Sequence, residues 1–144
     1  RKEYNSLSIN GSMKTPGRWH VNSMFGALYT SDSKDVAKKE IKRQNKKWNL
    51  RYDYKIVEII VSLKKILDLT DKDNLRILKV QEKELLSGYA LNPESVKIPN
   101  SIAYSAYLLG IEAILVKSST GLGKNLIIYI NNLSKTSILK NGIK

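Results

Sequence analysis

The stretch GRWHVNSMFGALYTSDSKDVAKKEI, residues Gly17–Ile41, decides the fold expected of this chain. A Pro-Gly turn precedes Arg18, and the run Phe25–Tyr29 has the composition of a short strand that ends in Tyr29. Glu40 lies in the segment that follows, and eleven positions separate Arg18 from Tyr29 and Tyr29 from Glu40. The three polar side chains therefore mark a turn, a strand end and a helix in close succession.

Glu40 lies on the apolar side of the helix that the sequence predicts over residues 34–47. The run Ser31–Ser33 supplies short polar side chains that can cap the first free N–H groups of this helix. At 3.6 residues per turn the apolar positions share one side, and Glu40 falls among them, whereas the lysines fall on the other; these apolar positions are Val36, Ala37, Ile41 and Trp48. A carboxylate on a buried face is costly unless it is paired. Two interpretations stay open: a structural Glu bonded to a backbone N–H or an Arg, or a carboxylate held in a cleft for chemistry.

The other two residues also have an ordinary structural interpretation. Tyr29 can be a core or edge aromatic, and Arg18 can be a surface Arg. His20, the only histidine, cannot form a metal site alone. We interpret it as a positioning group beside Arg18, with a role in proton transfer left open because His titrates near neutral pH.

The remaining sequence predicts alternating strands and short helices within one domain, residues 1–144. Strands are expected over 52–63, 112–117 and 125–130, and a last one around Ile138-Leu139, which could instead contact a partner. Helices are expected over 72–79, 82–87 and from Pro99-Asn100 to Gly110. The loop 118–124 is followed by a strand and lacks the Gly-Lys-Ser/Thr entry into a helix, so a P-loop triphosphatase is excluded.

Composition narrows the function class. The 144 residues are 42% hydrophobic, which suffices for a core, and contain no apolar run near 18 residues, so we expect no membrane span and no signal peptide at the start of the sequence. The absence of Cys excludes disulfides and thiolate metal sites and fits a reducing cytoplasm. The net charge is +12, and lysines line one face of the helix expected over 34–47. Such a surface would attract nucleic acid or an acidic partner, and the alternative is that the lysines form an ordinary solvated face.

The motifs of this chain resemble those of the RES-domain toxins, the toxin half of RES–Xre type toxin–antitoxin pairs, named after an Arg, a Glu and a Ser. The first block comprises Gly17-Arg18-Trp19, Leu28-Tyr29-Thr30-Ser31 and Ala37-Lys38-Lys39-Glu40. The middle motif is Ile66-Leu67-Asp68-Leu69-Thr70, and the second block comprises Gly110–Ser118 and Gly121-Leu122-Gly123-Lys124-Asn125. His20 stands where the family usually has Asn, and Lys117 where Pro usually precedes the Ser.

The resemblance implies an α+β, ADP-ribosyltransferase-like fold, with a mixed and split β-sheet core and short flanking helices in a single RES-like domain. It implies NAD⁺ as a substrate whose nicotinamide–ribose bond is broken by hydrolysis or phosphorolysis, or by transfer of ADP-ribose to a protein. It further implies a cognate antitoxin, allows a homo-oligomer within the toxin–antitoxin complex, and fits the cytoplasm of the producing or a target cell. No metal and no direct contact with nucleic acid are expected.

The residue types suit that chemistry, because the bond breaks through an oxocarbenium-like centre. The Arg18 guanidinium can bind the diphosphate, the Tyr29 ring can face nicotinamide or ribose, and the Glu40 carboxylate can stabilise positive charge. Ser118, Asn125 and His20 are expected to help bind NAD⁺. Neither a metal nor a Cys nucleophile is required, since nicotinamide leaves from a cationic substrate.

Two non-enzymatic alternatives remain at this point. A basic nucleic-acid-binding module would explain the charge but leaves a carboxylate on the apolar helix face unexplained. An inert relative that only binds a protein partner is the other, because His20 and Lys117 depart from the family pattern.

Overall fold

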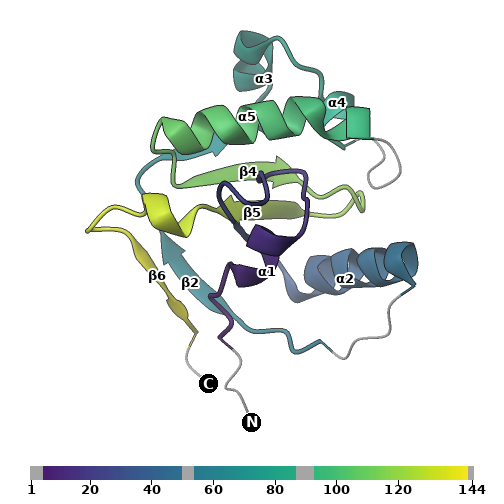
Figure 1. Cartoon of the computed structure of the whole chain (residues 1–144), viewed down its shortest axis with the longest axis vertical. Helices are drawn as coiled ribbons and strands as arrows, with labels where there is room; N and C mark the ends of the chain where they lie inside the picture. Colours follow the sequence, from purple (N-terminus) through teal and green to yellow (C-terminus); the bar gives the residue numbers. More distant parts are fainter. Residues whose placement is uncertain (1–4, 50–53, 87–92, 143–144) are drawn as a thin grey trace.

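The computed structural model describes residues 5–49, 54–86 and 93–142. Its helices are α1 (Asn10–Lys14), α2 (Lys34–Trp48), α3 (Lys72–Leu78), α4 (Glu82–Leu86) and α5 (Lys97–Leu108). Two 3₁₀ turns, η1 (Pro93–Val96) and η2 (Ile130–Asn132), complete the helical elements of these residues. Figure 1 shows the helices arranged around a central sheet.

The strands form two separate sheets. They are β1 (Leu28–Ser31), β2 (Ile59–Ser62), β3 (Ile66–Asp68), β4 (Ala113–Lys117), β5 (Lys124–Ile128) and β6 (Ile138–Asn141). The larger sheet has the order β1-β5-β4-β3, with β3 parallel to β4 and the other pairs antiparallel, and β2 pairs with β6 in a second, antiparallel sheet. The predicted α+β class, with a mixed and split sheet and short flanking helices, is confirmed.

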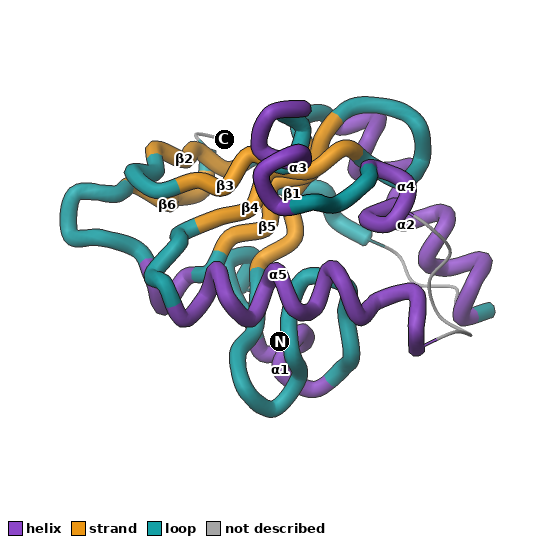
Figure 2. Tube along the Cα trace, turned by 90° about the horizontal axis from the view of Figure 1, so that it is seen from above, coloured by secondary structure: helices purple, strands orange, loops and turns teal. Residues whose placement is uncertain are grey.

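The core lies between one face of the larger sheet and α5. Because side chains alternate along a strand, Ile114 and Val116 of β4 point to the same face, and both are buried. Ala103 and Ala106 of α5 are also buried in this core. Figure 1 shows α5 lying across β4, and Figure 2 shows α5 and α1 on the same side of the sheet.

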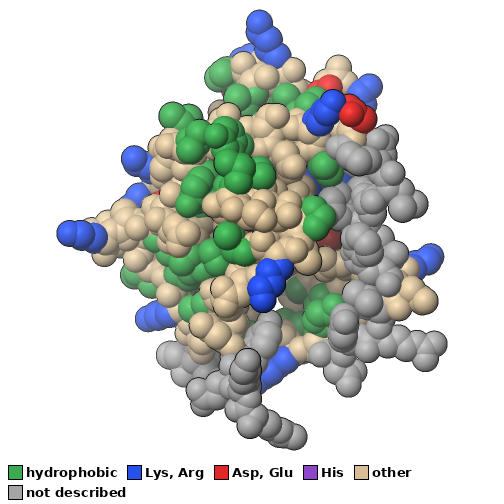
Figure 3. All heavy atoms as spheres, in the orientation of Figure 1, with side chains coloured by type: hydrophobic (Ala, Val, Ile, Leu, Met, Phe, Trp, Pro, Cys, Tyr) green, Lys and Arg blue, Asp and Glu red, His purple; other side chains and the backbone are tan. Residues whose placement is uncertain are grey.

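Aromatic side chains fill the part of the core near the end of β5. The ring of Phe25 stacks on Tyr107 at a centroid distance of 4.2 Å, and both rings meet Tyr129 edge-on. Leu108 and Leu109, which follow Tyr107 at the C-terminal end of α5, are exposed instead, and Figure 3 shows hydrophobic side chains gathered over the surface near α5. The described residues contain no helix that is both long and apolar enough to cross a membrane.

The first predicted elements agree with the structure in type but not always in extent. Helix α2 begins as expected after Ser33, whose hydroxyl accepts a hydrogen bond from the Val36 N–H. The strand expected over 25–29 starts only at Leu28 and continues to Ser31, so Tyr29 is its second residue rather than its end. The reason is that residue 27 bonds elsewhere: the Ala27 N–H donates to the Ser12 hydroxyl instead of to a neighbouring strand.

The strand predicted over 52–63 is largely wrong. Residues 52–53 lie outside the described residues, residues 54–58 form no strand, and only β2 falls within this range. A separate strand, β3, follows in the other sheet and had no strand prediction.

Later elements follow the predictions more closely. Helix α5 starts two residues before Pro99, and Gly110 beyond its end has a φ of 77°, as expected of a helix terminator. Strands β4 and β5 lie within the predicted ranges apart from one added residue, Lys124, and β6 is the predicted last strand.

Candidate active site

Glu40 on α2 is bonded to two of the residues predicted to share its site. Its Oε1 accepts a hydrogen bond from the Ser118 hydroxyl at 2.5 Å and one from the Asn125 side-chain amide at 2.8 Å. Ser118 follows directly on β4 and is buried, and Asn125 lies on β5. The fold therefore brings the Glu of the first motif block against the Ser and the Asn of the second.

The side chains around Glu40 form a longer chain of hydrogen bonds. Ser31 pairs with Asn125 across β1 and β5, and its hydroxyl donates to Asn125 Oδ1 at 2.9 Å. This bond fixes the orientation of the amide, so that its NH₂ points to Glu40. On the other side, the hydroxyl of Thr120 lies 2.6 Å from that of Ser118. Ser31 and Thr120 were not predicted as site residues, although both lie inside or beside the quoted motif segments.

The second carboxylate oxygen of Glu40 has a different environment. Among the described residues no group donates a hydrogen bond to Oε2, and none forms an ion pair with Glu40. The same residues contain no buried side-chain oxygen without a partner, so Oε2 is in contact with solvent. Neutral donors thus anchor one oxygen of the charged carboxylate and leave the other accessible to solvent.

The glycine-rich loop over 118–124 is fastened to the start of α2. The Asp32 carboxylate accepts a hydrogen bond from the Lys124 N–H at 3.0 Å, and the Ser118 N–H donates to the Gly123 carbonyl, also at 3.0 Å. Gly123 has a φ of 66°, and a Cβ there would lie 2.4 Å from Val36 Cγ2. Only glycine therefore allows the loop to approach α2 closely enough for Ser118 to reach Glu40.

Tyr29 and His20 form a second cluster. The Tyr29 oxygen lies 2.8 Å from His20 Nδ1 and accepts a hydrogen bond from the Trp19 N–H at 3.1 Å. The His20 ring is buried, and its Nε2 lies 2.7 Å from the Thr15 carbonyl oxygen. Both ring nitrogens are therefore bonded, one to Tyr29 and one to Thr15. The expected role of His20 beside Arg18 stays a prediction.

Arg18 contacts α4. Its Nη1 donates a hydrogen bond to the Leu85 carbonyl oxygen at 2.6 Å, and the side chain is half-buried. The hydrogen bonds around Glu40 do not include this guanidinium. Its predicted role in binding phosphate stays a prediction.

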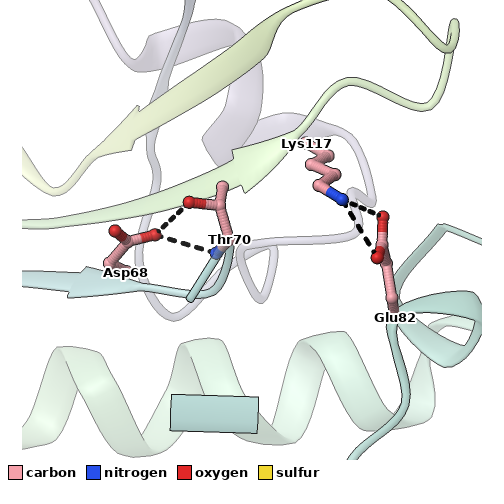
Figure 4. Close-up of polar contacts among 4 residues, drawn as sticks. All are labelled: Asp68, Thr70, Glu82 and Lys117. Atoms are coloured by element: carbon pink, nitrogen blue, oxygen red, sulfur yellow. Dashed lines mark hydrogen bonds and ion pairs between the residues drawn. The ribbon is translucent and has the colours of Figure 1, made fainter. Parts of the chain in front are cut away.

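The departure from the family pattern at Lys117 has a local explanation. Lys117, at the end of β4, forms an ion pair with Glu82 at the start of α4, with an N–O distance of 2.9 Å (Figure 4). Both side chains are partly exposed, so the pair adds little stability. Its effect is to connect α4 with the strand that leads into Ser118.

The middle motif is a structural turn. The Asp68 carboxylate accepts hydrogen bonds from the Thr70 N–H at 2.8 Å and from the Thr70 hydroxyl at 2.6 Å (Figure 4). Burial raises the pKa of Asp68, but the bonds from Thr70 and the charge of Lys124 outweigh it and lower that pKa. Asp71 then caps α3 by accepting from the Asp73 and Asn74 N–H groups. This motif therefore ends β3 and starts α3.

A buried carboxylate that the predictions missed lies immediately before β4. Glu112 accepts hydrogen bonds from the N–H groups of Lys64, Lys65 and Ser134 and from the Ser137 hydroxyl. Burial raises its pKa, but these donors prevail and hold the pKa at about 2. The signal in the sequence was an acidic residue at the head of the apolar run EAILV. Its satisfied bonds make Glu112 a structural residue.

The family assignment follows from the sequence as a whole. The sequence model of the RES domain matches residues 1–137. This chain belongs to the RES domain family.

A solved structure shares the fold of this RES domain. It is a chain in the crystal structure of the M. tuberculosis MbcT–MbcA toxin–antitoxin complex, with a TM-score of 0.73 and 17% sequence identity. The alignment covers 99% of this chain and 77% of that one. At this identity the similarity establishes the fold alone. No curated protein sequence matches the chain significantly.

Proposed function

We propose that this RES domain consumes NAD⁺ by breaking the bond between nicotinamide and ribose, as a glycohydrolase or a phosphorylase. The observation that carries the proposal is the geometry of Glu40. Two neutral donors hold one carboxylate oxygen, and the other oxygen is open to solvent with its charge uncompensated by a cation among the described residues. A fixed anion of this kind suits a reaction in which positive charge develops on the substrate.

The surrounding residues supply the remaining requirements of the reaction. Tyr29 is 45% exposed, so its ring can pack against the planar nicotinamide or the ribose. Ser118 and Asn125 hold the Glu40 carboxylate in place, so that it would already be positioned when positive charge develops on C1 of the ribose. Arg18 is proposed to bind the diphosphate, because a guanidinium binds phosphate oxygens in two-point geometry.

We further propose that the activity is that of a toxin controlled by an antitoxin in the cytoplasm. Membership of the RES family and the likeness in fold to a chain of a toxin–antitoxin complex support this. A homo-oligomer within such a complex remains part of the proposal.

The test is to follow NAD⁺ concentration with the purified chain, with and without inorganic phosphate. Glu40→Gln keeps the side-chain shape and an oxygen for Ser118 and Asn125 but removes the charge. We expect a fall in turnover of about 100-fold or more with an unchanged melting temperature. Glu58→Gln, a carboxylate outside this site and exposed to solvent, is the matched control and should retain full turnover.

Each outcome separates the alternatives. Loss of NAD⁺ only with phosphate identifies a phosphorylase, and loss without phosphate identifies a hydrolase. If ADP-ribose becomes attached to a protein added from a cell extract, the reaction is transfer to that protein and not hydrolysis or phosphorolysis. No consumption of NAD⁺ under any of these conditions, or full turnover by Glu40→Gln, contradicts the proposal, and salt-sensitive binding of DNA or RNA would then favour the nucleic-acid alternative.

A further inference from the structure

The hydroxyl of Tyr29 points into the protein while its ring stays accessible. The oxygen contacts the Trp19 N–H and His20 Nδ1, and the His20 side chain is only 3% exposed, whereas Tyr29 is 45% exposed. The two rings meet edge-on, with centroids 5.7 Å apart and an interplanar angle of 78°. The exposed part of Tyr29 is therefore dominated by its aromatic surface.

The hydrogen bonds determine which nitrogen of His20 carries the proton. Because a carbonyl oxygen can only accept, the contact with the Thr15 carbonyl requires a proton on Nε2. In a neutral imidazole Nδ1 is then an acceptor, so the Tyr29 hydroxyl donates to it. The same oxygen accepts from the Trp19 N–H. The phenol proton is thus directed into the protein.

The turn that carries His20 is held rigidly. The Asn100 amide on α5 donates to the carbonyls of Gly17 at 2.8 Å and Arg18 at 2.7 Å, and the Tyr129 hydroxyl donates to the carbonyl of Trp19 at 2.8 Å. A Cβ on Gly17 would lie 2.0 Å from His20 Cε1, so this residue must be glycine. These contacts fix the imidazole with respect to both α5 and β5, and through it the end of the Tyr29 side chain.

We propose that His20 is a positioning residue that holds Tyr29 by its hydroxyl, so that Tyr29 serves a bound substrate through its ring face and not as a proton donor. The inference rests on the proposed function for the identity of the substrate, a planar nicotinamide. It replaces the expectation that His20 itself binds NAD⁺, because a buried ring with both nitrogens bonded has no atom left for a ligand. It also gives a role to the histidine that replaces the usual Asn of the family.

The first test observes the hydrogen bond directly and does not depend on activity. His20 is the only histidine, so a ¹⁵N-labelled chain gives a single imidazole in a long-range ¹H–¹⁵N spectrum. In mildly alkaline buffer, where His is ordinarily neutral, we expect the Nε2–H tautomer with Nδ1 unprotonated. Tyr29→Phe should shift the Nδ1 resonance and leave the tautomer unchanged. A proton on Nδ1, or an Nδ1 resonance that does not shift in the Tyr29→Phe variant, would overturn the proposal.

The second test measures coupling between the two residues in NAD⁺ turnover. His20→Phe and Tyr29→Phe should each raise KM by about 5- to 20-fold with a smaller change in kcat, and the double variant should be no worse than either one. Effects that multiply in the double variant would mean that the residues act independently, against the proposal. A kcat that collapses in Tyr29→Phe would give the hydroxyl a chemical role, also against it.

The two tests separate this inference from the proposed function. If the native chain does not consume NAD⁺, the proposed function fails, and the imidazole spectrum still decides whether His20 holds Tyr29. If His20→Phe does not fold, the Tyr29→Phe spectrum remains decisive because it keeps the histidine.

Discussion

Replacing Glu112 by Gln should destabilise the chain and change how its stability depends on acid. The two carboxylate oxygens accept from four donors. The Lys64 and Lys65 N–H groups precede β3, and the Ser134 N–H and the Ser137 hydroxyl precede β6. Glu112 therefore joins β4 of the larger sheet to the segments that connect both sheets. In Gln one oxygen becomes an NH₂ group, which faces two donors and cannot accept from either.

The magnitude follows from the pKa. A carboxyl whose pKa falls from its ordinary value of 4.5 to about 2 in the folded chain contributes about 3 kcal/mol to the free energy of unfolding at neutral pH. Because the folded-state pKa is the lower one, this contribution is present above pH 4.5 and is lost as the pH falls toward 2. At pH 7 the variant, with two unpaired buried donors, should lose about 2–5 kcal/mol.

The assay is urea unfolding of the native chain and of Glu112→Gln at several pH values from about 7 down to about 2.5, with Glu58→Gln as control. The difference between native and Glu112→Gln should be largest at neutral pH and shrink below pH 4.5, whereas Glu58→Gln should follow the native curve. A difference that is constant with pH, or below about 1 kcal/mol at neutral pH, would refute the reasoning, because the carboxylate charge would then not be what the donors stabilise.

Substitutions at three further positions test the site and its loop. Asn125→Ala should lower kcat about 10-fold, because one charge-assisted hydrogen bond to Glu40 is lost. Asn125→Asp should lower kcat further, because it places a second carboxylate against Glu40. Equal losses of kcat in the two variants would contradict this electrostatic account. Gly123→Ala should lower the unfolding free energy by about 2–4 kcal/mol, since a Cβ meets Val36 at 2.4 Å and φ is positive. Gly121→Ala has a positive φ but nothing within 4 Å, so urea unfolding should show a loss of only about 1 kcal/mol.

Local patterns in the sequence were enough for the elements that carry the site. Helix α2 and the inward side of Glu40 follow from the 3.6-residue period and from the capping Ser33, both of which act over a few residues. The two apolar runs that became β4 and β5 could be recognised in the same way. The strand predicted from Phe25 begins only at Leu28, because the Ala27 N–H is bonded to the Ser12 hydroxyl and not to a neighbouring strand.

Tertiary structure alone decided which of these side chains meet. Ser118 and Asn125 reach Glu40 from 78 and 85 positions away, and that contact depends on the register of β1 with β5 and on the path of the glycine loop. The partners of His20 and the four donors of Glu112 likewise come from segments that local patterns do not relate. The sequence by itself determined helix α2 and the position of the Glu40 carboxylate on its apolar side, because periodicity and capping are local. The hydrogen bonds that anchor that carboxylate are long-range, and only the folded chain sets their geometry.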